Sequence, residues 1–301
     1  MVNQYEGHGR TQLTTEELNQ VEALMKICQT HDKVTMKLNW SMLRERSGDV
    51  VNDFVYVDNG QIIGFLGLYS FGTVEIEVSG MVHPDYRRQG IFTKLLKMAM
   101  EESIKRKYSK VLLICPGNSE SAKAFIGSTT GKYEFSEHYM ERNSNDAGEV
   151  VVPSTVETSI RLARYPEDRD VLIQSNMEAF EMTHDDAAEY VDQCAKSKDD
   201  LTFIADLDGV PISKIGVMVR KDSIFIFGFG VSKSMRGQGH GRNILNQTIA
   251  YGQQQLGKPN AALEVAVTNS GALGLYESCG FVHMRSIDYY AICAVTSNGV
   301  K

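Results

Sequence analysis

The residues with the clearest chemical potential form a glycine-rich stretch at 231–242, between an apolar segment and an amphipathic one. Gly237, Gly239 and Gly241 let the backbone approach a ligand closely, and the first turn of a helix carries N–H groups without intrahelical partners. Arg236 adds a guanidinium group. Such a loop attracts anions, so the stretch predicts an anion site, with a tight turn that holds no ligand as the alternative.

Two common nucleotide-binding loops do not fit this stretch. The dinucleotide pattern G-x-G-x-x-G does not match residues 237–241, and no acidic residue follows at the expected end of the next strand. The chain also has no G-K-[ST] of a phosphate-binding NTPase loop. A different phosphate-containing ligand is therefore expected.

The loop needs a strand before it and a helix after it. Residues 224–231 are apolar at consecutive positions, which predicts a strand buried on both faces, and residues 242–255 have helical spacing. Upstream, residues 203–205 and 215–219 read as a hairpin around Asp208-Gly209, and residues 262–267 read as the next strand. This order predicts an α/β fold with a mixed sheet flanked by helices.

The same pattern occurs twice, 149 residues apart. The positions that hold this register pair Gly60 with Gly209, Gly67 with Gly216, Val82 with Val231, Arg87 with Arg236 and Gly90 with Gly239. A period of this length is too long for a solenoid and predicts two copies of one domain. A polar, Gly-containing stretch at 143–153 separates them, so we expect domains at 1–145 and 153–301.

The first copy is expected to repeat the elements of the second. Its segments are a helix at 14–29, a hairpin of 54–57 and 62–66, a strand at 74–82, a helix at 92–106 and a strand at 110–115. In the second copy, residues 167–194 have the helix-like spacing that corresponds to the first of these segments.

Composition excludes several classes of protein. With 301 residues, 42% hydrophobic and 23% charged, the chain has enough apolar residues for folded cores. Its net charge of -7 is shared by both halves and disfavours a nucleic-acid or membrane-surface binder. The five cysteines contain no CxxC pair, and no His spacing is typical of a metal site. Without a signal-like or membrane-spanning run, we expect a soluble cytoplasmic protein.

Two motifs of the second copy resemble the GNAT superfamily of acetyl-CoA-dependent N-acyltransferases. Arg236, Gly239 and Gly241 fill the three defining positions of its pyrophosphate-binding motif, Q/R-x-x-G-x-G/A. Residues 269–281 resemble its second signature, and the likeness extends over about 158–290. The resemblance implies a tandem GNAT-like protein that uses acetyl-CoA, with the second copy intact and the first degenerate.

The resemblance also implies roles for individual residues. Asn269 would contact the pantetheine arm, and Tyr276 would protonate the leaving thiolate. Backbone N–H groups at Gly230 or Val231 would polarise the thioester carbonyl. The pyrophosphate would be held by the loop residues Arg236, Gly237, Gln238, Gly239, His240, Gly241 and Arg242. The alternatives are a Tyr276 that only packs its helix, a surface Arg236 and a Gly230 that only forms a bulge.

The first copy keeps part of this machinery. Val82, Arg87, Arg88 and Gly90 match the cofactor loop, but Phe92 stands where Gly or Ala is usual. Counting from the Asn motif places Phe125 opposite Tyr276, so the proton-donating phenol is missing. This half lacks the obvious proton donor, and whether it still holds acyl-CoA is left open.

The general base stays open. Glu75 and Glu77 lie two apart on a strand and share a face, and a carboxylate on this strand resembles the base of several family members. The second copy has Ile224 and Ile226 instead. Substitutes near its predicted first helix are Glu178, Glu181, His184 and Asp185, and a water relay is a further alternative.

The sequence thus predicts an N-acetyltransferase that transfers acetyl directly from acetyl-CoA to a primary amine in the second copy. Positioning of the cofactor favours this copy, because orientation supplies more of the barrier reduction than one proton transfer. The acceptor is left open among small metabolites, amino sugars, antibiotics and protein amines, as is the oligomeric state. The rivals are a noncatalytic acyl-CoA-binding module and catalysis in the first copy with Glu75 or Glu77 as base.

Overall fold

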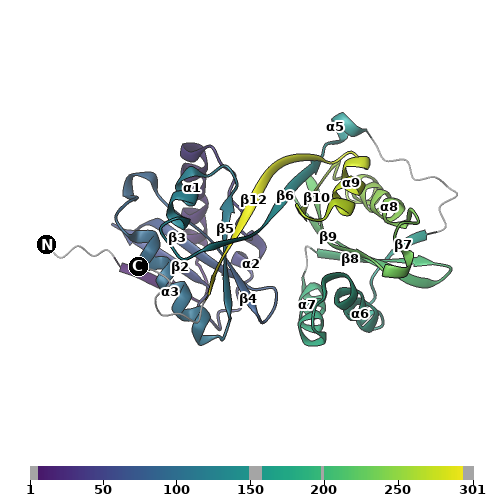
Figure 1. The fold of residues 1–301 in the computed structure, drawn as a ribbon, viewed down its shortest axis with the longest axis horizontal. Coiled ribbons are helices and arrows are strands. Elements are labelled where there is room, and N and C mark those ends of the chain that lie inside the picture. The colour runs from purple at the N-terminus through teal and green to yellow at the C-terminus, as the bar shows by residue number, and fades with distance from the viewer. Residues whose placement is uncertain (1–5, 149–157, 198–199, 294–301) are drawn as a thin grey trace. The chain divides into compact units, whose positions relative to one another are not determined.

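The computed structural model describes residues 6–148, 158–197 and 200–293. The chain forms two compact units (Figure 1). The first contains the residues up to Ser136 and from Ser286 on, and the second contains Glu137–Arg285. Each unit is a mixed sheet with helices packed against both faces, which confirms the expected α/β class.

In the first unit the strand order is β1-β2-β3-β4-β5-β12, antiparallel except for the parallel pair β4 and β5. Its elements are β1 (Glu6–Arg10), α1 (Thr15–Asp32), α2 (Trp40–Arg44), β2 (Asp53–Asp58), β3 (Gln61–Tyr69), β4 (Glu75–Val82), a 3-10 turn (Pro84–Tyr86), α3 (Ile91–Lys105), β5 (Lys110–Pro116), α4 (Glu120–Ile126) and the first part of β6 (Lys132–Arg142).

Local sequence explains how these elements begin and pack. The Thr14 side chain accepts a hydrogen bond from Glu17 N, and Glu17 accepts one from Thr14 N, a capping box that starts α1. Helix α1 packs Leu24 against Phe65 on one face of the sheet. Helix α3 packs Leu95 with the apolar side chains of the other face. Buried residues on both faces explain why β3 is almost continuously apolar.

The second unit repeats this plan. Its strand order is β6-β11-β10-β9-β8-β7, with β10 and β11 parallel. Its elements are α5 (Ser144–Ala147), β7 (Thr158–Leu162), α6 (Arg169–Phe180), α7 (His184–Lys196), β8 (Asp200–Leu207), β9 (Val210–Val219), β10 (Ser223–Val231), a 3-10 turn (Lys233–Met235), α8 (His240–Gln254), β11 (Asn260–Ala266), α9 (Ser270–Ser278) and β12 (Val282–Cys293).

The helical spacing over 167–194 belongs to two helices rather than one. Glu181 ends α6 in the left-handed conformation, with φ 55°, and Thr183 starts α7 by accepting a hydrogen bond from Asp186 N. Thr183 is a good N-cap residue, and this capping competes with continuation of the helix. Sequence spacing alone does not reveal the break, because both helices bury apolar residues at similar intervals.

Two strands cross between the units along the chain. β6 pairs through Glu137–Arg142 with β11 of the second unit, and β12 pairs through Ile287–Cys293 with β5 of the first. The ends of the compact units therefore differ from the ends of the two sequence copies at 1–145 and 153–301. Internal similarity identifies a repeated strand but does not determine which copy that strand completes.

Within the described parts of the chain, no helix is both long and apolar enough to cross a membrane.

Candidate functional site

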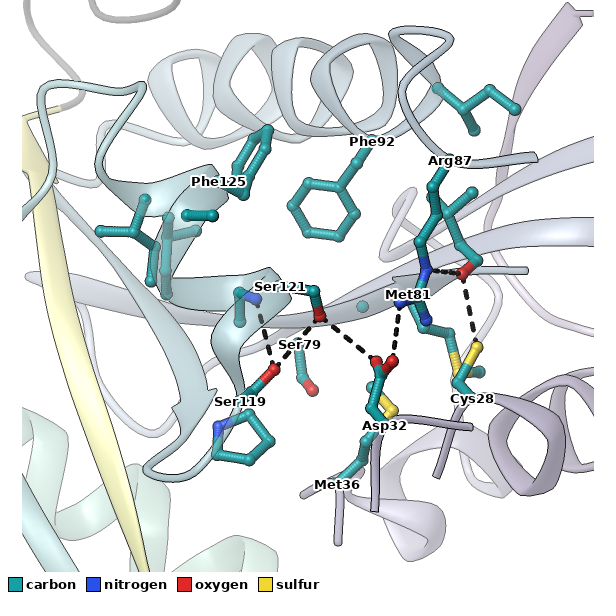
Figure 2. A pocket seen from close by; sticks show the side chains of 18 of the residues that line it. Cys28, Asp32, Met36, Ser79, Met81, Arg87, Phe92, Ser119, Ser121 and Phe125 are labelled. Atoms are coloured by element: carbon teal, nitrogen blue, oxygen red, sulfur yellow. Dashed lines mark hydrogen bonds and ion pairs between the residues drawn. The ribbon is translucent and has the colours of Figure 1, made fainter. Parts of the chain in front are cut away.

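A cavity of about 490 Å³ lies in the first unit, where β4 and β5 stop pairing. The parallel pairs run from Glu75–Lys110 to Val78–Leu113. Beyond them, Ser79 and Met81 of β4 and Ser119 of the loop before α4 line the cavity, together with the loop that starts α3 (Figure 2). This volume lies in the range of small-molecule sites.

Across this cavity, the Asp32 carboxylate accepts hydrogen bonds from two side chains of other elements, Arg87 and Ser121 (Figure 2). Arg87 Nη1 donates to Asp32 Oδ1 at 2.8 Å, and Ser121 Oγ donates to Asp32 Oδ2 at 3.2 Å. Burial acts to raise the pKa of Asp32, but hydrogen bonds from Arg87 and His31 outweigh it and hold the pKa below its usual value. Asp32 is therefore ionised at neutral pH and compensates the charge of Arg87.

The loops before α3 and α8 share one geometry. Gly90 and Gly239 are the N-caps of these helices, with φ 76° and 89°, and neither helix start has a side-chain cap. A Cβ at either glycine would meet nothing within 4 Å. The space beside each N-cap glycine is therefore open, as an anion site at a helix start requires.

The loop arginines of the two units have different surroundings. Arg87 Nε donates to Val82 O at 3.0 Å, and Arg236 Nε donates to Val231 O at 2.8 Å, so their backbone contacts match. Arg87 also has the Asp32 carboxylate, whereas no carboxylate partner for Arg236 occurs among the described residues. The second loop therefore keeps an uncompensated positive charge.

The strand before the second loop is bulged. β10 and β11 pair up to Ile226–Leu263, and the register of β10 against β9 shifts between Phe227 and Gly230. A Cβ at Gly230 would lie 2.5 Å from Ala179 Cβ, so Gly230 is required by the close approach of α6. The bulge that was the alternative for Gly230 is present, and the carbonyl contact at Gly230 or Val231 stays a prediction.

The helix caps correct the alignment of the two halves. Ser119 caps α4 by accepting from Ala122 N, and Asn269 caps α9 by accepting from Ala272 N. Matching these caps requires one inserted residue rather than two and places Ile126 opposite Tyr276. The predicted equivalence of Phe125 with Tyr276 was wrong, because a sequence offset taken from Asn118 does not identify which residue caps the helix.

This corrected alignment bears on Tyr276. Ile126 lines the cavity of the first unit. Tyr276 therefore occupies the position in the second unit that corresponds to a cavity-lining residue of the first. Tyr276 is 8% exposed, and its ring packs edge-on to Phe281. Burial raises the pKa of Tyr276 to about 12, so its hydroxyl is protonated at neutral pH. Phe125 instead packs edge-on to Phe92 inside the first cavity.

The candidate bases are scattered. Glu75 Oε2 bonds to Lys110 Nζ at 2.8 Å, and Glu77 lies opposite Tyr69 in the pairing of β3 and β4; neither lines the cavity. Strand register makes Ser223 and Phe225 their counterparts in the second unit, because Glu75 pairs with Lys110 and Ser223 with Asn260 at the start of each parallel pair. The predicted counterparts Ile224 and Ile226 were wrong, because the bulge of β10 shifts the offset between the copies; both are buried. The other predicted candidates, Glu178, Glu181, His184 and Asp185, lie at the end of α6 and the start of α7.

Glu178 accepts a hydrogen bond from Lys233 N, at the start of the second loop. Its carboxylate is therefore tied to that loop. Glu181 is the residue that ends α6. Asp185 is exposed, and its Oδ1 lies 3.4 Å from Nδ1 of the neighbouring His184. The general base stays a prediction.

The sequence did not single out two charged residues that are prominent in the structure. Asp32 lies at the end of α1, far along the chain from the loop that it contacts, and no local pattern marks it. Lys214 is 3% exposed in β9, beside Ile212 and Ile215. A charged residue inside an apolar strand was a signal for it, because Lys is rarely buried without a partner.

Comparison with known proteins identifies the family. The family model described as the acetyltransferase (GNAT) family matches residues 17–128 and 169–281, one match in each copy of the repeat. Among curated proteins, no match is found.

Solved structures share the fold over nearly the whole chain. A GCN5-related N-acetyltransferase from Sphaerobacter thermophilus is 17% identical, with a TM-score of 0.78 over 96% of each chain. A tandem GNAT protein from the clavulanic acid biosynthesis pathway is 16% identical, with a TM-score of 0.76 over 98% of this chain and 100% of that chain.

A third similar structure is part of a larger protein. The glucosamine N-acetyltransferase region of a fungal multi-domain β-N-acetylglucosaminidase is 16% identical, with a TM-score of 0.72 over 97% of this chain and 38% of that chain. The family model covers most of both units, and the chain therefore belongs to the GNAT family of acetyltransferases, as an acyltransferase built from two tandem GNAT domains.

Proposed function

We propose that the protein transfers an acetyl group from acetyl-CoA to a primary amine by direct attack in a ternary complex, and that the second unit carries out the chemistry. One observation carries this choice. Tyr276 is equivalent to Ile126, which lines the cavity of the first unit, so the second unit has a phenol at this position and the first unit does not.

The loop of the second unit would hold the diphosphate. The space beside its N-cap Gly239 is open, and Arg236 of the same loop has no compensating carboxylate among the described residues. Guanidinium groups and converging amides suit phosphate oxygens. Acetyl-CoA supplies the activated acyl group, and Asn269 would meet its pantetheine arm near the start of α9.

The reaction needs two further contacts at the thioester. Backbone N–H groups at Gly230 or Val231, next to the bulge of β10, would polarise the carbonyl. The Tyr276 hydroxyl would give its proton to the departing sulfur; its raised pKa keeps the hydroxyl protonated at neutral pH but makes it a weaker acid than an ordinary phenol. Glu178 near the second loop, or a water relay, would take the proton of the attacking amine.

The first unit would bind acyl-CoA without turning it over. Its cavity has the right size and the same helix-start geometry, but it lacks the phenol, and Asp32 compensates the charge of Arg87. A noncatalytic ligand site fits these three features.

Catalysis in the first unit is the second candidate function. The cavity of about 490 Å³ favours it, with Glu77 or Glu75 as base. Against it, Glu75 is bonded to Lys110, and neither carboxylate lines the cavity.

The acceptor is proposed only as a class, a primary amine. The similar fungal region is described as a glucosamine N-acetyltransferase, so amino sugars are the first acceptors to assay. Small metabolites, antibiotics and protein amines complete the panel, and the acidic net charge of -7 favours cationic members.

The substitution Tyr276→Phe tests the proposal. We expect thiol release with an active amine to fall about 10²-fold or more, because general acid catalysis contributes on this scale. Calorimetric affinity for acetyl-CoA should stay within about twofold, since the ring is retained. Tyr251→Phe is the matched control, because its ring also packs in the second unit, against Phe203. Full turnover in Tyr276→Phe would reject the second unit's phenol as the acid.

A further inference from the structure

An amine of the protein itself lies on the α6 and α7 side of the second unit. Lys214 is on β9, directly opposite Gly230 of β10, and is 3% exposed. Its Nζ lies 5.0 Å from the ring centroids of both Phe180 and Tyr190. Among the described residues no carboxylate forms an ion pair with it. A buried ammonium held only by aromatic rings is costly, which makes a purely structural role a poor explanation.

The side chain of Lys214 reaches across from β9 to the bulge of β10. A Cβ at Gly228 would lie 2.8 Å from Lys214 Nζ and 3.1 Å from Tyr190 Oη, so both groups lie over this glycine. Gly228 follows the last pairing of β10 with β11, at Ile226–Leu263, and has φ 53°. Under the proposed function, the thioester carbonyl lies beside this bulge. Lys214 Nζ therefore occupies the place from which an acceptor amine attacks.

We infer that Lys214 is an internal acyl acceptor, whose Nζ is acetylated by acetyl-CoA bound to the second unit. The inference rests on the proposed function. In the step, the lone pair of the neutral amine attacks the thioester carbon, the C–N bond forms and the C–S bond breaks. The sulfur leaves as coenzyme A thiolate and takes a proton from Tyr276, while water takes the proton lost by nitrogen and returns a proton to the Tyr276 phenolate. The products are acetyl-lysine and coenzyme A thiol.

Physical chemistry favours this modification. Burial lowers the pKa of Lys214 to about 8, so a useful fraction of the amine is neutral and nucleophilic near neutral pH. The other titratable groups around it are Tyr165, Tyr190, Cys194 and Asp200. Acetylation replaces a buried charge by a neutral amide, which removes the desolvation penalty.

There is limited space for the product. A cavity of about 10 Å³ adjoins Lys214, Thr202 and Asn176, which is room for at most about one water molecule, so the acetyl group requires neighbouring side chains to move. The buried Asn176 Oδ1 has no partner among the described residues and can accept a hydrogen bond from the new amide N–H. The first unit offers no such acceptor, because the position equivalent to Lys214 is Phe65.

The test compares two acetylating agents on the full-length protein. Acetyl-CoA with a deuterated acetyl group is incubated with the protein, and peptides are mapped by mass spectrometry. Acetic anhydride is used in parallel and modifies amines according to exposure. We expect acetyl-CoA to label Lys214 at least tenfold faster than exposed lysines such as Lys97 and Lys132, and acetic anhydride to give the reverse order. Hydroxylamine treatment removes any thioester on Cys194 and leaves the lysine amide.

Variants separate a specific reaction from a chemical background. Gly239→Trp, which blocks the second loop, and Tyr276→Phe should lower the labelling of Lys214 at least tenfold and leave that of Lys97 unchanged. Lys214→Arg and Lys214→Met should lose the modified peptide while they keep cooperative thermal unfolding.

The outcomes distinguish this inference from the proposed function. Calorimetric binding of acetyl-CoA and thiol release with an added amine, together with an unlabelled Lys214, would overturn the internal acceptor and leave the proposed function standing. If Lys214 in the Gly239→Trp variant were still labelled as fast as Lys97, the internal acceptor would also be overturned. Absence of acetyl-CoA binding would overturn both.

Discussion

At the scale of single residues, charge compensation separates the two halves. Both loop arginines make the same contact with a strand carbonyl, but only Arg87 is paired with a carboxylate, at 2.8 Å from Asp32. The pair spans a cavity wall and is partly buried, so it competes with a phosphate for the same guanidinium. Asp32, at the end of α1, thus weakens the anion site that the sequence of the loop before α3 would predict by itself.

Asp32→Asn should strengthen binding of acetyl-CoA to the first unit by about tenfold, or about 1.4 kcal/mol. The amide keeps hydrogen bonds to Arg87 and Ser121 but releases the charge. Calorimetry in the Gly239→Trp background measures the first unit alone, and Asp85→Asn, an exposed carboxylate near the same loop, is the control. Weaker binding in Asp32→Asn would mean that Asp32 serves to position Arg87.

The depressed pKa of Lys214 makes stability depend on pH. In the folded chain this pKa is about 8, against 10.5 for an unperturbed lysine, so the unfolded chain binds more protons between these values. The free energy of unfolding should therefore rise from pH 8 to 10.5, by about 3 kcal/mol relative to Lys214→Met, and the difference between the two proteins should be constant below pH 8. Denaturant unfolding of both proteins from pH 8 to 10.5 measures this rise. A difference in unfolding free energy that does not change with pH would refute the lowered pKa of Lys214.

At the scale of elements, helix starts carry both stability and function. α3 and α8 begin at glycines without a side-chain cap, which leaves their N–H groups to a ligand, whereas α1 and α7 begin at the capping residues Thr14 and Thr183. The sequence predicted a helix that begins at residue 14, close to the observed start of α1, and it predicted both glycine loops. It did not predict the break before α7, which depends on the single cap at Thr183.

Thr14→Ala should lower the stability of the first unit by about 1 kcal/mol, the usual value for loss of an N-cap. Trp40 is the only tryptophan and lies in the first unit, so its fluorescence follows that unit during denaturation. Thr183→Ala removes the equivalent contact in the second unit and is the matched control, expected to leave the Trp40 transition in place. If Thr14→Ala and Thr183→Ala shifted the midpoint of the Trp40 transition equally, the assignment of these caps to separate units would be contradicted.

At the scale of the whole molecule, the internal repeat predicted the class of fold and the two copies. Pairs such as Arg87 with Arg236 keep one register because each copy forms the same strand, loop and helix. The repeat did not predict that β12 completes the first unit, since strand exchange depends on contacts between distant segments. It also did not predict the cavity, because Asp32 and Ser121 meet there only through the fold.

Removal of the residues from Ser286 onward should destabilise the first unit most. β12 covers the edge of β5 with an antiparallel ladder from Ile287 to Cys293 and buries Tyr289. Without it, an apolar edge is exposed. We expect the Trp40 transition to move to lower denaturant, and an unchanged midpoint would contradict the observed exchange of strands.

Thiol release by Gly239→Trp and Gly90→Trp tests the central claim most directly. The two glycines are matched, because each caps a helix with positive φ and each faces open space. With an active amine and both variants shown to unfold cooperatively, the account predicts loss of turnover in Gly239→Trp and near wild-type turnover in Gly90→Trp. Loss of turnover in Gly90→Trp alone would contradict it and move the chemistry to the first unit.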